Sequence, residues 1–227
     1  MEPNVDVQKV GGEKPSLFGM ITSPRLQFER MKTSSSVWGA LIILAVLGGI
    51  VSIINNYINF NSPQLQAVME NEQAAMFKNI TIGTSFFTGM LGVAMGFMFA
   101  AAVYKVIMMF IGNDTPYQKL LSITVYTGII TCIGLLINGV LAIVFGGDGT
   151  VKYTSLGPLF EKGTVAFGIG STIDIFVIWA LVVTGLGLHI TAGLSKKQAT
   201  IFVVVFFIIS LAFGAVVGLV SGLFPKA

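Results

Sequence analysis

The sequence predicts an all-α, polytopic integral membrane protein with five transmembrane helices, preceded by an interfacial amphipathic helix. Hydrophobic residues make up 54% of its 227 residues and charged residues only 10%, against about 25% charged in an ordinary soluble domain. The charges also leave five uncharged windows, each long enough for the roughly 20 apolar residues of a bilayer-spanning helix: 33–69, 79–104, 120–147, 175–195 and 198–225.

A polar segment precedes the first window and divides into two parts. Residues 1–14 are mixed in charge and predict a flexible cytoplasmic tail. Residues 15–36 contain Ser23 followed by Pro24, a typical helix start, after which Pro24, Phe28 and Met31 share one face. This pattern predicts either a helix lying in the membrane interface or a short helix packed against the rest of the protein.

The membrane domain is expected at residues 37–223, with a short outer tail at 224–227. Its first outer connection, 63–79, repeats apolar residues and predicts a surface helix. The second, 147–170, is rich in glycine and predicts an irregular, partly mobile loop. The five expected spans are 37–58, 82–104, 121–146, 171–194 and 200–223.

The basic residues predict the orientation of the chain in the bilayer. Nine of the 13 lie on the side of the N-terminal segment, and four lie on the opposite side. Cytoplasmic connections are enriched in lysine and arginine. We therefore expect a bacterial cytoplasmic membrane protein with its N-terminus in the cytoplasm and its C-terminus outside.

The reactive side chains are few. A metal site needs several converging His, Cys or carboxylate ligands, and the chain offers His189 and Cys132 without an HExxH or CxxC motif. It also lacks a GxSxG serine and a phosphate-binding loop. We therefore expect no catalytic residues, no cofactor and no metal. The net charge of +3 is ascribed to basic residues that flank the membrane, so no nucleic-acid partner is expected.

Four polar residues lie within or near the spans: Asp174, Asn138, Lys105 and His189. Lys105 and His189 are expected near the cytoplasmic interface, where a lysine side chain can extend toward the headgroups. Asp174 is expected roughly 6 Å into the fourth span, with Asn138 at a similar depth. A buried carboxylate needs a hydrogen-bond donor, which favours a structural Asp174, with a partner contact or an ion path as alternatives.

Small residues recur at four-residue spacing on two spans. Such stripes let helix backbones approach closely in lipid, either within this chain or against another membrane protein. The second span carries Gly92, Gly96 and Ala100, and the fifth carries Ser210, Gly214, Gly218 and Gly222.

Three stretches resemble the Yip (Ypt/Rab-interacting protein) domain family of five-span membrane proteins. They are SPRLQF at 23–28, GNDTPYQKLLS at 112–122, and DIFVIW at 174–179 continuing to GLSKKQA at 193–199. Their order and spacing extend the resemblance over residues 16–222. The long cytoplasmic region and DLYGP signature of the eukaryotic members are not evident. The sequence is more similar to the bacterial branch, in particular the YknW type that is encoded with a MacAB-like ABC exporter.

The resemblance implies an accessory subunit without chemistry of its own. It would lie beside the permease/ATPase and the adaptor of an ABC-type exporter, in the lipid bilayer, and assemble with or regulate them. Docking is expected first at Gly214, Gly218 and Gly222, and then at Gly92 and Gly96.

Two other functions stay open from the sequence. One is a small transporter or channel, with a path near Asp174, Asn138 and Lys105. The other is a homo-oligomeric scaffold that self-associates through the glycine stripes.

Overall fold

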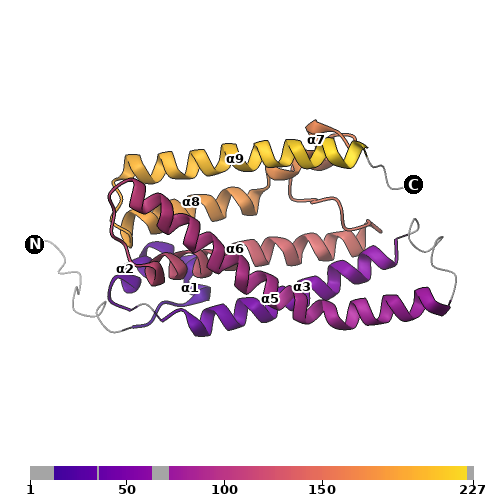
Figure 1. The fold of residues 1–227 in the computed structure, drawn as a ribbon, viewed down its shortest axis with the longest axis horizontal. Helices are drawn as coiled ribbons and strands as arrows, with labels where there is room; N and C mark the ends of the chain where they lie inside the picture. The colour runs from indigo at the N-terminus through magenta and orange to yellow at the C-terminus, as the bar shows by residue number, and fades with distance from the viewer. Residues whose placement is uncertain (1–12, 35, 63–71, 224–227) are drawn as a thin grey trace, which may run out of the picture.

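The computed structural model describes residues 13–34, 36–62 and 72–223, most of which are helical. The long helices lie along the longest axis of the molecule (Figure 1). In chain order the described helices are α1 (Leu17–Thr22), α2 (Pro24–Thr33), α3 (Trp38–Phe60), α5 (Glu72–Phe110), α6 (Tyr117–Val144), the 3-10 turn η2 (Gly157–Leu159), α7 (Val165–Thr172), α8 (Ile175–Ile190) and α9 (Lys196–Leu223).

The apolar helices confirm the predicted class of protein. Four helices, α3, α5, α6 and α9, are long and apolar enough to cross a membrane, and α8 is a shorter apolar helix of 16 residues. The chain is therefore an all-α polytopic membrane protein. The first, third and fifth predicted spans correspond to α3, α6 and α9 within a few residues. The second is longer than predicted, because α5 has 39 residues and a length of about 58 Å.

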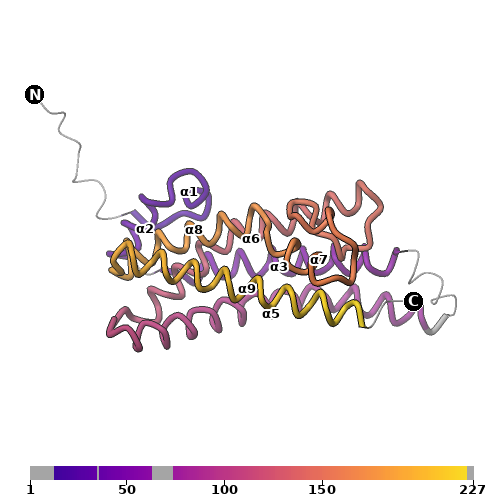
Figure 2. Tube along the Cα trace, turned by 90° about the horizontal axis from the view of Figure 1, so that it is seen from above, coloured from indigo at the N-terminus to yellow at the C-terminus, as the bar shows by residue number. Residues whose placement is uncertain are grey.

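Successive long helices run in alternate directions between two different ends of the bundle (Figure 1). The α1–α2 end, on the left, holds these two helices and the turns at 111–116 and 191–195. The α7 end, on the right, holds the connection at 145–164, η2 and α7. Figure 2 shows α1 and α2 on one side of this bundle, where α1 packs on α6 and α2 packs on α8.

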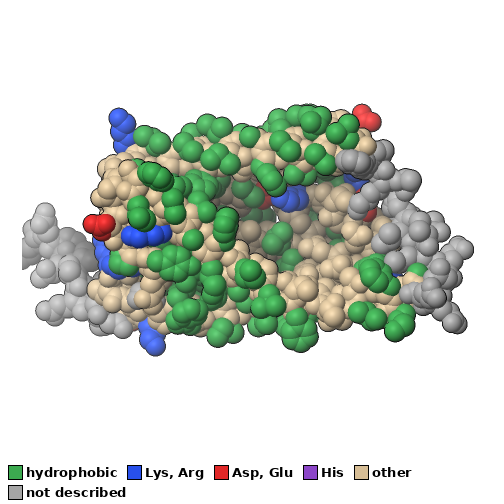
Figure 3. Space-filling view, in the orientation of Figure 1, with side chains coloured by type: hydrophobic (Ala, Val, Ile, Leu, Met, Phe, Trp, Pro, Cys, Tyr) green, Lys and Arg blue, Asp and Glu red, His purple; other side chains and the backbone are tan. Residues whose placement is uncertain are grey.

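The hydrophobic core lies mainly at the α1–α2 end. Its fully buried side chains come from six helices and include Met20, Phe28, Leu44, Met108, Leu120 and Leu188. The helices pack in two groups, α3 against α5 and α6, and α9 against α7 and α8, and the two groups are joined where α6 packs on α8. One face of the molecule is hollowed beneath α9 as a result, and basic atoms lie within the hollow (Figure 3).

The predicted fourth span, 171–194, is not one helix. Its first two residues end α7, the chain then becomes extended at Asp174, and α8 begins at Ile175. Asp174 has φ −116° and ψ 139°, and its side chain accepts hydrogen bonds from the first turn of α8. The aspartate is thus the N-cap of a new helix, a role that aspartate fills well, and not a residue inside a continuous span.

The two outer connections agree with prediction only in part. Residues 63–71 of the predicted surface helix lie outside the described residues, and residues 72–79 form the start of α5. The second connection, expected to be irregular and partly mobile, contains η2 and the start of α7. Lys162 and Asp148 form an ion pair of 2.9 Å across it.

The amphipathic face of α2 packs inward, so of the two predicted alternatives α2 is the short helix packed against the rest of the protein. Phe28 and Met31 are 0% and 1% exposed, and Pro24 is half-buried. Gly187 of α8 makes room for the Phe28 ring, since a Cβ there would lie 2.6 Å from the ring atom Cε1. The face of α2 that could have entered the membrane interface is therefore part of the protein core.

Candidate functional site

The first polar feature of the α7 end is the carboxylate of Asp174, which is 3% exposed. Its Oδ1 accepts hydrogen bonds from the backbone N–H groups of Phe176 at 2.8 Å and Val177 at 3.2 Å. Its Oδ2 accepts a hydrogen bond from the Thr154 hydroxyl. Both carboxylate oxygens are engaged, and the side chain fixes the start of α8.

Thr154 connects this carboxylate to Asn138 on α6. The Asn138 amide donates to the Thr154 hydroxyl oxygen at 2.6 Å, and the Thr154 backbone N–H donates to the Asn138 side-chain oxygen at 3.2 Å. The backbone continues the link, because Leu156 N–H donates to Ile173 O and Ile175 N–H donates to Thr154 O. Non-helical backbone within a membrane protein needs such partners. We call Asn138, Thr154 and Asp174 the outer polar cluster, after the side of the membrane on which the basic residues predict this end to lie.

The glycines of α9 contact α7 of the same chain. A Cβ on Gly214 would lie 2.6 Å from the Gly168 carbonyl oxygen, and one on Gly218 would overlap the Thr164 carbonyl oxygen. A Cβ on Gly222 would overlap the backbone oxygen of Gly163. The fifth-span stripe is therefore used for internal helix packing, which was one of its two predicted roles. Its first member, Ser210, is half-buried and donates to the Phe207 carbonyl oxygen of its own helix.

Beside this contact, α7 and α9 leave a half-open groove of about 250 Å³. Its walls include Lys152 and Ser171 on one side, and Phe213, Val217 and Ser221 of α9 on the other. Figure 3 shows this face of the molecule hollowed beneath α9. The groove combines one cationic group with an apolar wall.

The stripe on α5 has the opposite character. A Cβ on Gly92 or Gly96 would meet nothing within 4 Å, and Ala100 is half-buried. Met95 and Phe99 beside the stripe are 68% and 73% exposed. These two glycines provide a smooth surface on the outside of the bundle that no described part of the chain covers.

At the α1–α2 end, hydrogen bonds hold the N-terminal helices on the bundle. The Tyr126 hydroxyl lies within 3.1 Å of the Pro15 carbonyl oxygen and 3.2 Å of the Ser36 carbonyl oxygen. The Thr191 hydroxyl donates to the Phe28 carbonyl oxygen at 2.9 Å. These three bonds join residues from 90 to 163 positions apart in sequence, so the N-terminal helices and the membrane helices form one unit.

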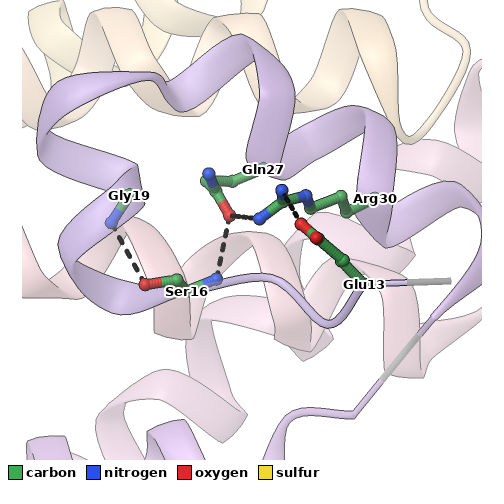
Figure 4. Close-up of polar contacts among 5 residues, drawn as sticks. All are labelled: Glu13, Ser16, Gly19, Gln27 and Arg30. Atoms are coloured by element: carbon green, nitrogen blue, oxygen red, sulfur yellow. Dashed lines mark hydrogen bonds and ion pairs between the residues drawn. The ribbon is translucent and has the colours of Figure 1, made fainter. Parts of the chain in front are cut away.

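A small polar group lies inside the N-terminal helices (Figure 4). The Gln27 side-chain oxygen accepts a hydrogen bond of 2.9 Å from the Ser16 backbone N–H. Arg30 reaches the same oxygen and forms an ion pair with Glu13. The Ser16 hydroxyl accepts from the Gly19 backbone N–H at 3.2 Å and so caps α1. These contacts link both ends of the α1–α2 segment.

Lys105 and His189 both lie at the α1–α2 end, as the position count predicts. The Lys105 ammonium donates to the Thr115 carbonyl oxygen at 3.0 Å, and His189 Nδ1 lies 2.6 Å from the Leu194 carbonyl oxygen. Each side chain therefore satisfies backbone in the turn that follows its own helix. The structure does not bring Lys105 to Asp174 and Asn138, because these lie toward opposite ends of the bundle.

Among the described residues outside the spans, the loop at the α7 end carries the one strong electrostatic effect. Burial alone would raise the pKa of Asp148, but hydrogen bonds from Thr150 and Lys162, with the Lys162 charge, lower this pKa to about 2. Asp148 and Lys162 thereby fix the loop near the groove. Lys152, in the same loop, has no ion-pair partner among the residues that the structure describes.

With these features placed, the chain can be compared with known proteins. Residues 18–218 match the Yip1 domain. The chain belongs to the Yip1 domain family. It is also 33% identical over 230 residues to "Membrane protein YknW" of Bacillus subtilis (strain 168), a match that covers 97% of this chain and 98% of that protein. No solved structure matches the chain.

The stretches that resemble the Yip family have structural roles in this member. Residues 23–28 start α2 and supply buried Phe28. In the 112–122 stretch, the Asn113 amide and the Thr115 hydroxyl both donate to the Ala192 carbonyl oxygen, at 3.0 and 2.9 Å. This joins the 112–122 stretch to the turn preceding the 193–199 stretch. The remaining stretch begins with Asp174, the cap of α8.

Three residues with a clear role at these sites were missed by sequence reasoning. Thr154 is the centre of the outer polar cluster, and nothing in its local sequence indicates this. Gly168 lies in an eight-residue helix too short for a membrane-span pattern. Gly89 packs on α3, where a Cβ on it would lie 2.7 Å from the Gly48 carbonyl oxygen. The small residues Ser85 and Gly89, four positions apart in sequence, were a usable signal for this helix contact.

Proposed function

We propose that this Yip1-domain protein is a non-enzymatic accessory subunit of the cytoplasmic membrane that assembles with an ABC-type exporter. The exporter is inferred from the resemblance to the YknW type, and the 33% identity to YknW over nearly the whole of both chains supports that choice. Among the described residues, no three His, Cys, Asp or Glu side chains gather as metal ligands. The polar groups of the outer cluster are engaged in capping and packing.

The observation that carries the proposal is the open stripe on α5. Gly92 and Gly96 have no described neighbour within 4 Å of an added Cβ, whereas the α9 glycines are covered by α7. Close backbone approach at small residues is a main route to helix association in lipid. The docking surface is therefore assigned to α5, and its occupant is one transmembrane helix of the exporter permease.

The charges support an orientation with the α1–α2 end in the cytoplasm. That end carries Lys105, Lys119, Lys196 and Lys197 besides the basic residues of α2, and cytoplasmic connections are enriched in such residues. A permease helix on α5 would then lie along the full thickness of the bilayer, since α5 is longer than the roughly 30 Å hydrocarbon core.

The proposal is tested by recovery of the permease with Gly92→Leu. The tagged full chain is purified from its native membranes in mild detergent, and co-purifying proteins are identified by mass spectrometry. Overpacking a helix contact costs about 1–3 kcal/mol, so recovery of an ABC-type permease is expected to fall about fivefold or more. Membrane insertion should not change, because the site is open.

Gly83→Leu is the matched control. Gly83 is also on α5 and also open, but it lies about 180° around the helix from Gly92. Equal permease recovery with both variants would place the contact elsewhere and refute the assignment to α5. If no ABC-type permease accompanies the wild-type chain and cross-linking yields only copies of itself, the homo-oligomeric scaffold replaces this proposal.

A further inference from the structure

The groove between α7 and α9 lies at the level of the bilayer at which a lipid can bind. On α9, Ser221 lies about 3 Å and Phe213 about 15 Å along the helix from its end at Leu223. Half of a bilayer's hydrocarbon core is about 15 Å thick. The groove therefore extends from the level where the span ends to the level where lipid acyl chains lie, and its half-open side faces outward.

The charge of the groove comes from Lys152. Its neighbour in the loop, Lys162, is neutralised by Asp148 at 2.9 Å. No hydrogen bond or ion pair involves the Lys152 ammonium within the described part of the chain. The Lys152 side chain is exposed, so a charged group outside the protein can reach it. Its attraction to an anion is stronger than in bulk water where the adjoining apolar wall lowers the local dielectric constant. The groove thus favours a ligand with a negative group at this level.

The rest of the lining indicates what the remainder of such a ligand must be. Phe167, Phe213 and Val217 form an apolar wall, and Phe213 is 69% exposed. The ligand therefore has an anionic head and an apolar chain. These are the two parts of an acidic glycerophospholipid.

We infer that the α7–α9 groove binds one acidic glycerophospholipid, with its phosphate on Lys152 and an acyl chain along Phe213 and Val217. This goes beyond the proposed function, because it concerns α7 and α9 and needs no partner protein. The lipid covers the apolar wall of the groove and supplies the counter-ion of Lys152. One lysine near an anionic lipid contributes enough attraction for about a fivefold preference.

The test is native mass spectrometry of the full chain in mild detergent, titrated with dioleoylphosphatidylglycerol or dioleoylphosphatidylcholine. The wild type is expected to bind one phosphatidylglycerol about fivefold more tightly than phosphatidylcholine. Lys152→Gln should lose this preference, whereas the control Lys162→Gln should retain it, since Lys162 does not line the groove. Val217→Trp fills the groove without changing its charge and should weaken binding of phosphatidylglycerol at least fivefold.

Three results would overturn the inference. Equal loss with both lysine variants would mean diffuse charge attraction at the loop. Undiminished lipid binding by Val217→Trp would place the lipid outside the groove. Displacement of phosphatidylglycerol by an equal concentration of inorganic phosphate would mean that Lys152 binds a free anion. Binding to the α5 stripe is not altered by any of these variants, so permease recovery separates this inference from the proposed function.

Discussion

Replacing Gly214 by alanine tests a close contact between α9 and α7. The added Cβ would lie 2.6 Å from the Gly168 carbonyl oxygen, where ordinary contact begins at 3.4 Å. The Cβ would also overlap the side-chain oxygen of Thr172, which can rotate away. The Gly168 carbonyl is backbone and cannot, so α7 must move by about 0.8 Å, the difference between 2.6 and 3.4 Å. Overpacking of this kind costs about 1–3 kcal/mol. We expect the free energy of unfolding to fall by that amount.

The loss can be measured as a melting midpoint of the purified chain in mild detergent. For a chain of this length each kcal/mol lowers the midpoint by about 2–4 °C, so the drop should lie between about 2 and 12 °C. Hydrogen exchange followed by mass spectrometry locates the change, with faster exchange expected in α7 and not in α3.

Gly92→Ala is the matched control, because it adds the same methyl group where nothing lies within 4 Å. Its melting midpoint should equal or exceed that of the wild type, since alanine favours helix over glycine. If Gly214→Ala has the same melting midpoint as Gly92→Ala, the close packing of α7 on α9 does not exist in the protein and the reasoning fails.

Other contacts give three further predictions. Asp174→Ala removes the cap of α8 and the acceptor of the Thr154 hydroxyl, so the free energy of unfolding should fall by about 2–4 kcal/mol. Asp174→Asn still caps the helix, so its loss in the same melting assay should be less than half of that. Tyr126→Phe loses the bond to the N-terminal segment and should raise tryptic cleavage within α2 about two- to tenfold, as expected for about 0.5–1.5 kcal/mol. The pKa of Asp148 lies at about 2 instead of 3.8, so the contact of Asp148 with Lys162 is fully present above pH 3.8 and is lost as the pH falls through about 2. The infrared carboxylate band that disappears in Asp148→Asn reports the titration of Asp148. Lys162→Gln should move the midpoint of that titration toward 3.8.

Each of these has an outcome that counts against it. Asp174→Ala and Asp174→Asn with the same melting midpoint would show that capping is unimportant. An unchanged cleavage rate in Tyr126→Phe would mean that the N-terminal helices are held by packing alone. A carboxylate band that titrates at 3.8 in the wild type would exclude the Asp148–Lys162 contact in solution.

The sequence was informative wherever one property decides the structure. Scarcity of charge located α3, α6 and α9, because a helix in lipid must be both apolar and continuous. The spacing of Phe28 and Met31 identified the apolar face of α2, although not whether lipid or protein covers it. Counting residues along the helices also predicted that Asp174 and Asn138 lie within a turn or two of one depth, and in the structure Thr154 joins the two side chains.

Properties that depend on a partner elsewhere in the chain were not predictable in the same way. Hydropathy does not reveal a helix break, so Asp174 was placed inside a span, although an aspartate before an apolar run is also a helix-start signal. Equal glycine spacing on α5 and α9 gave no hint that α7 covers one stripe and leaves the other open. Thr154 joins Asn138 and Asp174 through a loop whose course only the fold defines.

The pairing of α7 with α9 also has a consequence for how the protein is made. Ribosomal synthesis is vectorial, so α7 is complete at Thr172, 24 residues before α9 begins at Lys196 and 42 residues before Gly214. During that interval the Gly168 face of α7 has no partner from its own chain. Emergence of the last helix from the insertion machinery is therefore the step that closes this end of the molecule, and a nascent chain halted before it would present an uncovered glycine surface to the quality-control proteases of the membrane.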